Sequence, residues 1–170
     1  ADAATTTQQS TTTQETSQET SADTAAEATT QETVVDLSKV YKKENIQVKY
    51  RGYKVVKRYQ DSNQSSLDVE PEEGGSLLAV KFRVSNQTDK TVTTDLLNAG
   101  YQYTLHTDSK TVEPMLTILE SDLSSLQVKL KPGQKKTAVL LFEIPKGAKK
   151  PLNYQLDITN GSDTTTIELQ

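Results

Sequence analysis

Apolar and polar residues alternate along much of the chain beyond residue 45, and the pattern is clearest over residues 77–84. Successive side chains of a strand point to opposite faces, so an apolar residue at every second position predicts a half-buried strand. The buried face is then expected to hold Leu78, Val80, Phe82 and Val84, and the outer face Leu77, Ala79, Lys81 and Arg83.

A polar corner, residues 85–90, follows this strand. It is rich in Ser, Asn, Thr and Asp, whose side chains bond to nearby backbone in turns. The β-branched run over residues 91–97 comes next. We therefore expect the corner to close a hairpin in which residues 91–97 return antiparallel.

Another strand is predicted from residue 46 onward. Ile46, Val48 and Tyr50 alternate, but Tyr53 follows after a gap of three. This change of phase at Gly52 is typical of a β-bulge. Residues 34–45 fit either one helical turn or the lead into a strand, and the acidic, turn-rich residues 61–75 are expected to form a long loop.

Further strands are predicted downstream. They cover residues 101–105, 115–119, 126–130, 138–144, 152–158 and 167–169, with turns at residues 107–110, 132–133 and 160–161 and a loop or single helical turn at residues 120–125. Val139 and Leu141 make one of these strands apolar on both faces, so we expect it to be central or covered. Many short strands without a helical period predict an all-β, antiparallel sandwich. Its core must rest on aliphatic residues and Tyr, because Cys and Trp are absent.

Residues 1–33 show no such pattern. They contain no Leu, Ile, Val, Phe, Tyr or Trp and consist mostly of Thr, Gln, Ala, Ser and Glu. Such a segment buries too little apolar surface to offset its conformational entropy, so we expect a disordered spacer with an r.m.s. span of about 30 Å. One domain over residues 34–170 follows it. A membrane or cell wall is the obvious body from which a spacer holds a domain away; a cytosolic tail or an expression scar is the alternative.

Charge follows the same division of the chain. Residues 1–33 hold six acidic residues and no Lys or Arg, whereas the whole chain has a net charge of −4. The segment is therefore −6 and residues 34–170 are +2, which is too little to suggest nucleic acid as a partner. The chain has no Cys, which excludes disulfides and thiolate metal sites. It begins ADAATTT, as we expect of a mature chain whose targeting segment has been removed.

Three stretches in order, residues 73–92, 100–110 and 130–158, resemble a known family. In them Asn86 precedes a polar turn, Pro132–Gly133 precedes an apolar strand, and Phe142 and Pro145 end that strand. This is similar to the immunoglobulin-like domain of unknown function of Gram-positive bacterial lipoproteins, a family mislabelled as telomeric-repeat-binding-factor-like. The resemblance covers roughly residues 46–160. It implies an immunoglobulin-like β-sandwich, lipid-anchored outside the cell through an N-terminal cysteine that is not in this chain, and it brings no catalytic residues.

Candidate chemistry is sparse, and no cofactor is predicted. His106 is the only histidine, and no motif of a Ser–His–Asp unit accompanies it, so a solvated surface position is the preferred interpretation. Carboxylates crowd residues 61–73 without the spacing of an EF-hand. A solvated acidic loop is preferred there, and Ca²⁺ binding stays as the alternative. No metal site is predicted.

Basic residues form two clusters along the sequence, residues 39–58 and residues 129–150. If the two clusters share a face, they could bind an anionic wall polymer, lipid headgroups or an acidic partner. The alternative is that edge-strand lysines discourage sheet-to-sheet aggregation. The candidate patch for an anionic partner consists of Lys49, Arg51, Lys54, Lys57, Arg58, Lys129, Lys131, Lys135 and Lys136.

The sequence therefore predicts a non-enzymatic lipoprotein domain at the extracellular face of the cell membrane, or secreted. It would bind an unknown protein or an anionic envelope polymer, and it would meet the membrane only through its inferred lipid anchor. A structural spacer or assembly subunit of a cell-envelope complex is the alternative. A hydrolase without a recognisable motif is the third hypothesis.

Overall fold

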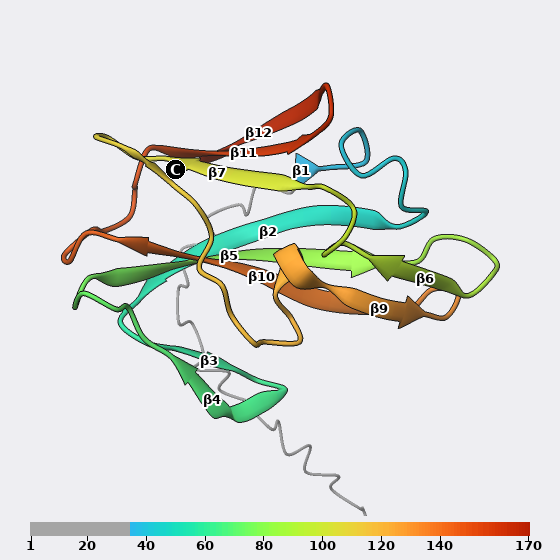
Figure 1. Cartoon of the computed structure of the whole chain (residues 1–170), viewed down its shortest axis with the longest axis horizontal. Helices are drawn as coiled ribbons and strands as arrows, with labels where there is room; N and C mark the ends of the chain where they lie inside the picture. The colour runs from blue at the N-terminus through green and yellow to red at the C-terminus, as the bar shows by residue number, and fades with distance from the viewer. Residues whose placement is uncertain (1–34) are drawn as a thin grey trace, which may run out of the picture. The chain divides into compact units, whose positions relative to one another are not determined.

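The computed structural model describes residues 35–170, so the predicted spacer over residues 1–33 lies outside the described residues. Two four-stranded antiparallel sheets pack face to face (Figure 1). The first sheet has the order β1–β2–β5–β10, formed by Val35–Asp36, Gln47–Val56, Ser76–Ser85 and Lys135–Ile144. The second has the order β12–β11–β7–β8, formed by Asp163–Leu169, Tyr154–Asn160, Gln102–His106 and Thr111–Val112. The predicted all-β, antiparallel immunoglobulin-like β-sandwich is confirmed.

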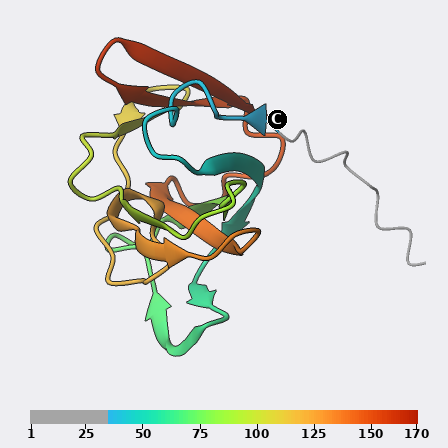
Figure 2. The same cartoon turned by 90° about the vertical axis from the view of Figure 1, so that its right-hand side faces the viewer.

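Two short strand pairs complete the described chain. One pairs β3 (Tyr59–Asp61) with β4 (Gln64–Val69), and the other pairs β6 (Val92–Asp95) with β9 (Gln127–Leu130). A single 3₁₀ turn, Leu123–Ser125, lies where a loop or helical turn was predicted. Figure 2 shows the second sheet above the first, with the β3–β4 hairpin below both.

The main core lies between the two sheets, where alternation placed it. Phe82, Leu140 and Leu156 are fully buried, and Ile46 is also buried. Burying such large side chains is the principal favourable contribution to folding, at about 1.5–3 kcal/mol each. The prediction of a pleated sandwich that hides these residues is confirmed.

The bulge predicted at Gly52 is also confirmed. The pairing of β2 with β5 shifts register between Tyr50 and Tyr53, and Gly52 has φ 101°. A residue with a side chain rarely adopts this backbone conformation, whereas glycine does so without steric cost. The extra residue lets Tyr50 and Tyr53 both point into the core although they are three positions apart.

The corner after β5 does not close a hairpin, so that prediction was wrong. β5 pairs with β2 and β10, while β6 pairs with β9. β5 leads through the corner into β6, and β9 leads through a turn into β10. The β6–β9 pair therefore extends the β5–β10 pair beyond the corner. Asn86 holds the chain in this path from β5 to β6. Its fully buried amide donates to the carbonyl oxygens of Lys90 (2.7 Å) and Leu130 (2.9 Å).

The outer face of the first sheet differs from the prediction at one end. Leu77 and Ala79 were expected to face water, and they are fully buried. Ala79 belongs to a second hydrophobic cluster, formed with Leu119, Val139 and Leu141. The residues expected to form a long acidic loop instead include the β3–β4 hairpin, whose Tyr59, Leu67 and Val69 pack over this cluster.

β10 is covered, as its double apolar pattern predicted, but it is not central in its sheet. Residues 115–119, predicted as a strand, form none. Only Met115 pairs with β10, through its backbone nitrogen and the Leu141 oxygen at 2.7 Å. A short, mostly apolar run gives too little alternation to distinguish a strand from an irregular edge segment.

Candidate binding groove

A groove lies at the end of the first sheet where β2 stops and β5 starts. Its walls come from residues 55–58, 70–71, 74–76 and 146–149, and its volume is about 660 Å³. Val55, Val56, Pro71 and Ala148 give it apolar walls. We call it the end groove. Its volume falls in the range of roughly 300–1,000 Å³ that is usual for ligand sites.

Glycine lets the backbone before β5 lie close to the end of β10 beside the groove. Gly75 precedes the pair Ser76 and Ile144, and a Cβ atom at Gly75 would lie 2.6 Å from the carbonyl oxygen of Ile144. Across the groove, Gly147 has φ 84° in the turn that follows β10, a conformation that favours glycine. Both glycines line the end groove, so the absence of a side chain at each shapes its wall.

Basic side chains surround the end groove. Lys57, Arg58, Lys146 and Lys149 all line it, against a single lining carboxylate, Glu70. Arg58 pairs with Glu70 (2.7 Å) and Asp68 (3.3 Å), which holds its guanidinium in place. Across residues 35–170, no ion pair engages the three lysines, so their charges are available to a ligand.

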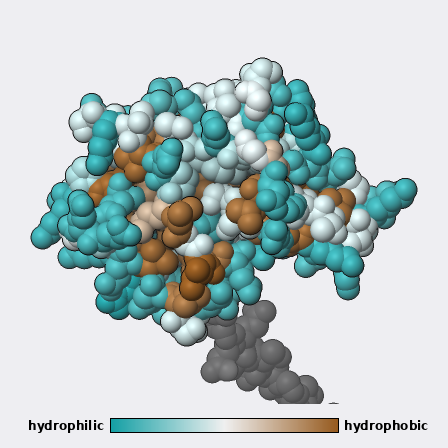
Figure 3. Space-filling view, viewed as in Figure 1, coloured by the Kyte–Doolittle hydropathy of each residue, from teal (hydrophilic) through white to brown (hydrophobic). Residues whose placement is uncertain are grey.

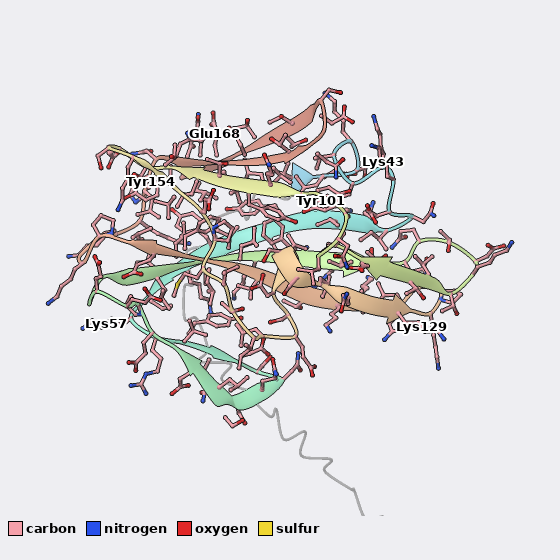
Figure 4. All side chains as sticks on the ribbon, viewed as in Figure 1. Lys43, Lys57, Tyr101, Lys129, Tyr154 and Glu168 are labelled. Atoms are coloured by element: carbon pink, nitrogen blue, oxygen red, sulfur yellow. The ribbon has the colours of Figure 1, made fainter. Side chains whose placement is uncertain are left out.

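The nine residues of the candidate patch do not share one site. Lys57 lies at one end of the first sheet, whereas Lys129 lies beyond the other end, on β9 of the β6–β9 pair (Figure 4). Lys57 and Arg58 join Lys146 and Lys149, which belong to the other sequence cluster, in the end groove. The structure therefore recombines the two sequence clusters, because β2 and β10 flank β5 and both run antiparallel to it.

The remaining members of the patch are spread over β2, β9 and the start of β10. Lys49 is opposite Arg83 of β5, and Lys135 is opposite Ser85, so both lie near the corner at Asn86. Lys54 is opposite Ala79, and Arg51 lies in the bulge. The others, near the turn that joins β9 to β10, are Lys129, Lys131 and Lys136.

The sole histidine lies on the second sheet, away from the end groove. The Nε2 atom of His106 is 2.8 Å from Oδ2 of Asp157, and the hydroxyl of Thr166 donates to the other Asp157 oxygen at 2.6 Å. Both members of the His–Asp pair are partly exposed on the outer face. Thr166 contacts the carboxylate rather than the imidazole, so the order of groups in a nucleophile–base–acid unit is absent from this trio.

Three of the acidic residues between 61 and 73, namely Asp61, Asp68 and Glu70, have partners within the protein. Asp61 is buried and accepts hydrogen bonds from the Ser121 hydroxyl and, at 2.8 Å, from the backbone nitrogen of Asn63. Asp68 and Glu70 pair with Arg58. Among the described residues, no three His, Cys, Asp or Glu side chains are grouped to hold a metal ion.

Three tyrosines pack together beside the second sheet. The rings of Tyr41 and Tyr101 stack with centroids 4.5 Å apart, and the hydroxyls of Tyr41 and Tyr103 are 2.9 Å apart. Burial raises the pKa of Tyr41 well above its usual value, and burial also raises the pKa of Tyr103. The cluster belongs to the core, in agreement with the expectation that Tyr replaces the missing Trp and Cys.

Sequence reasoning missed an exposed apolar feature, residues 116–120, which we call the arch. Leu116 is 99% exposed and Ile118 is 80% exposed. Figure 3 shows apolar surface on the face that this segment crosses in Figure 1. The sequence signal was present as an apolar run, but its pattern does not say which members are buried.

The family and the solved structures that resemble this chain carry no assigned activity. The family described as "Domain of unknown function (DUF4352)" matches residues 35–166. An uncharacterized β-sandwich protein from Clostridium difficile 630 is similar in structure, with a TM-score of 0.51 and 10% identity, over 75% of this chain and 87% of that one. No curated protein matches the chain.

Two further solved structures show weaker similarity. The yjhA protein from Bacillus subtilis has a TM-score of 0.45 and 18% identity, over 75% of this chain and 93% of that one. A protein from Staphylococcus aureus described as a "putative lipoprotein" has a TM-score of 0.42 and 12% identity, over 74% and 85%. Within residues 35–170, no helix is long and apolar enough to cross a membrane.

Proposed function

The chain belongs to the DUF4352 family, a family of unknown function, and on that premise we propose that its sandwich is a non-catalytic binding module displayed at the cell surface. The end groove is its binding site. The observation that carries the proposal is the pairing of apolar walls with three lysines that have no ion-pair partner among residues 35–170. Such a groove suits a partner that brings both an apolar group and negative charge.

Display outside the cell is part of the same proposal. The composition of residues 1–33 supports it, since a polar segment without branched aliphatic or aromatic residues suits a spacer. The resemblance described above supports a lipid anchor upstream of this segment. On this arrangement the sandwich reaches partners beyond the membrane surface, and the lipid alone enters the bilayer.

A non-catalytic role fits the chemistry of the described residues. The His106–Asp157 pair lies on the second sheet, whereas the end groove contains neither residue. The groups that line the groove are lysines, an arginine paired with carboxylates, and small or apolar residues. These groups bind and orient a ligand, but they include no paired nucleophile and base.

Retention of partners from envelope extracts tests the proposal. The triple variant Lys57→Glu, Lys146→Glu and Lys149→Glu reverses the charge of the end groove and should lose the partners that the unmodified protein retains. A matched control, Lys129→Glu, Lys131→Glu and Lys135→Glu, makes the same charge change elsewhere and should retain them. Equal retention by the groove variant and the unmodified protein would refute the groove as the site.

A structural role in an envelope assembly is the second candidate function. The exposed Leu116 and Ile118 favour it, since covering apolar side chains with a neighbouring subunit removes them from water and lowers the free energy. Mass measurement by light scattering distinguishes the two roles. Growth in mass with concentration that persists after Lys57→Glu, Lys146→Glu and Lys149→Glu supports an assembly subunit that uses another surface, whereas loss of envelope partners in that variant supports the binding module.

A further inference from the structure

The arch is held in a defined position by contacts at both ends. The backbone nitrogen of Met115 donates to the Leu141 oxygen (2.7 Å), and that of Val139 donates to the Ser121 oxygen (2.8 Å). On β10 the two anchor points, Val139 and Leu141, are two residues apart, whereas five residues of the arch separate Met115 from Ser121. The five residues must therefore bow away from the strand.

Further contacts fix the side of the arch that faces the protein. The backbone nitrogen of Glu120 donates to Oε1 of Gln64 at 2.8 Å, and Leu119 packs into the second cluster with 3% exposure. Leu116 and Ile118 then point the other way, into solvent. Only three large apolar residues of the described chain are exposed, and two of them lie on this arch.

Acidic residues flank the two exposed aliphatic side chains. Glu113 precedes the arch, Glu120 ends it, and both are exposed. Neither forms an ion pair with another residue of the range 35–170. The arch therefore presents an apolar centre between two negative charges.

The end groove has the complementary arrangement. Its walls are apolar, and its unpaired charges are those of Lys57, Lys146 and Lys149. Glu72 and Glu73 belong to the same loop as the lining residue Glu70, but they do not line the groove. No residue of the arch lines the groove of its own molecule, so each molecule carries both halves of the contact separately.

We propose that the end groove of one molecule binds the Leu116–Ile118 arch of a second copy of this chain. This inference rests on the proposed function, because it names the partner of the same groove. Leu116 and Ile118 enter the groove, and Glu113 and Glu120 face its lysines. Because the two surfaces differ, the contact is head-to-tail and builds open chains of sandwiches rather than closed dimers.

The contact is small, so it acts at high local concentration. Two aliphatic side chains and their flanking charges bury much less than the roughly 1,200 Å² at the lower end of standard interfaces, so we expect weak binding, with a dissociation constant on the order of 10⁻⁴ M. Proteins crowded on one surface reach such concentrations. Added salt should weaken the contact, because the lysine–glutamate attractions are screened.

Sedimentation velocity over a range of protein concentrations tests the proposal with two variants. The arch variant carries Leu116→Ser and Ile118→Ser, and the groove variant carries Lys57→Glu, Lys146→Glu and Lys149→Glu. All five positions lie at the surface, so the circular dichroism spectrum and the urea midpoint should stay unchanged. The unmodified protein should form a ladder of oligomers, and each variant alone should be monomeric.

The decisive sample is an equimolar mixture of the two variants. The arch of the groove variant can still enter the groove of the arch variant, so the mixture should yield a one-to-one complex that grows no further. A monomeric mixture, or a mixture that extends beyond two subunits, would overturn the head-to-tail contact. A monomeric unmodified protein at concentrations well above 10⁻⁴ M, on the order of 10⁻³ M, would also overturn it.

A peptide covering residues 113–120 gives an independent readout. Its addition should shift amide resonances of Lys57, Lys146 and Lys149, and the same peptide with Ser at positions 116 and 118 should bind at least about tenfold more weakly. Equal binding of the two peptides would overturn the role of the aliphatic side chains. If self-association fails but the groove variant still loses its envelope partners, the proposed function stands and this inference falls. If the groove variant keeps those partners as well, both fall.

Discussion

The carboxamide nitrogen of Asn86 donates a hydrogen bond of 2.9 Å to the carbonyl oxygen of Leu130, and so joins the end of β5 to the end of β9. The oxygen of the same amide accepts from the backbone nitrogen of Thr88 at 2.9 Å. Backbone hydrogen bonds from Asn86 to Gln134 and from Gly133 to Asn86 complete the junction. One buried side chain thus directs the chain from the first sheet into the β6–β9 pair.

Replacing Asn86 by Ala should lower the free energy of unfolding by about 2–3 kcal/mol, because the Leu130 carbonyl would lose its hydrogen bond in a buried place. Urea unfolding followed by circular dichroism measures the change. Gln87→Ala is the control, since the neighbouring Gln87 is exposed and bonds only to Ser85 Oγ among the described contacts. Equal midpoints for the two variants would show that the Asn86 junction is not a source of stability.

Leu116 and Leu119 provide a matched pair of substitutions on one segment. Leu119→Ala should cost about 2–4 kcal/mol, because it leaves a cavity in the second cluster beside Leu141. Leu116→Ala should change the free energy of unfolding by less than about 0.5 kcal/mol, because this side chain is 99% exposed. Thermal or urea unfolding of dilute protein compares them, and a large loss for Leu116→Ala would contradict the exposed position of the arch.

Stability should fall as the solution becomes alkaline. The folded-state pKa of Tyr41 is raised by burial, so the unfolded chain releases its phenolic proton first, near the ordinary value of about 10. Above that pH the unfolded state binds fewer protons than the folded state, and the free energy of unfolding decreases with pH. Below it, Tyr41 is protonated in both states and has no effect on the slope.

Urea midpoints measured between pH 8 and pH 11.5 test this dependence. Tyr41→Phe lowers stability at neutral pH, because the hydroxyl pair with Tyr103 is lost, but it should flatten the alkaline decline. An unchanged slope in the Tyr41→Phe variant would show that other groups, and not Tyr41, carry the linkage. Tyr103 keeps a raised pKa of its own, so part of the decline should persist.

Gly75 should tolerate no side chain. A Cβ atom there would lie 2.6 Å from the Ile144 carbonyl oxygen, which is backbone and cannot move aside cheaply. Gly75→Ala should therefore cost about 1–3 kcal/mol and widen the end groove. Gly74→Asn is the comparison, because Gly74 has open space around it and a φ of 69° that Asn adopts more readily than most residues. Similar unfolding free energies for the two variants would rule out the predicted clash.

The features that could be predicted from the sequence are those that depend on residue spacing within a single strand. The buried face from Leu78 to Val84 and the bulge at Gly52 follow from the spacing of residues within a single strand. The pairing partner of a strand could not be predicted in this way. Residues 92–95 read as the return of a hairpin, but a partner 35 residues downstream, at residues 127–130, competes successfully for them.

The candidate site depended even more on pairing between distant strands. Lys57 and Lys146 belong to different clusters along the sequence, and only the shared pairing of β2 and β10 with β5 brings them to one groove. Leu77 and Ala79 were predicted on the outer face, but they are buried. Alternation within a strand shows which residues share a face, and it does not show whether another segment covers that face. The predicted patch residues Lys49 and Lys129 lie outside the groove. Closeness along the sequence does not show which end of a sheet a residue occupies.

Because of the β3–β4 hairpin, the first sheet has a buried region on each of its two faces. One side of β5 packs into the sandwich, and the other side is closed by the hairpin, which Asp61 fastens to Ser121. A local opening of this cover needs less free energy than global unfolding, and it would bare Ala79 and Leu141 while the sandwich stayed intact. Substitutions confined to the hairpin should therefore change how readily this second cluster is exposed, without altering the core between the two sheets.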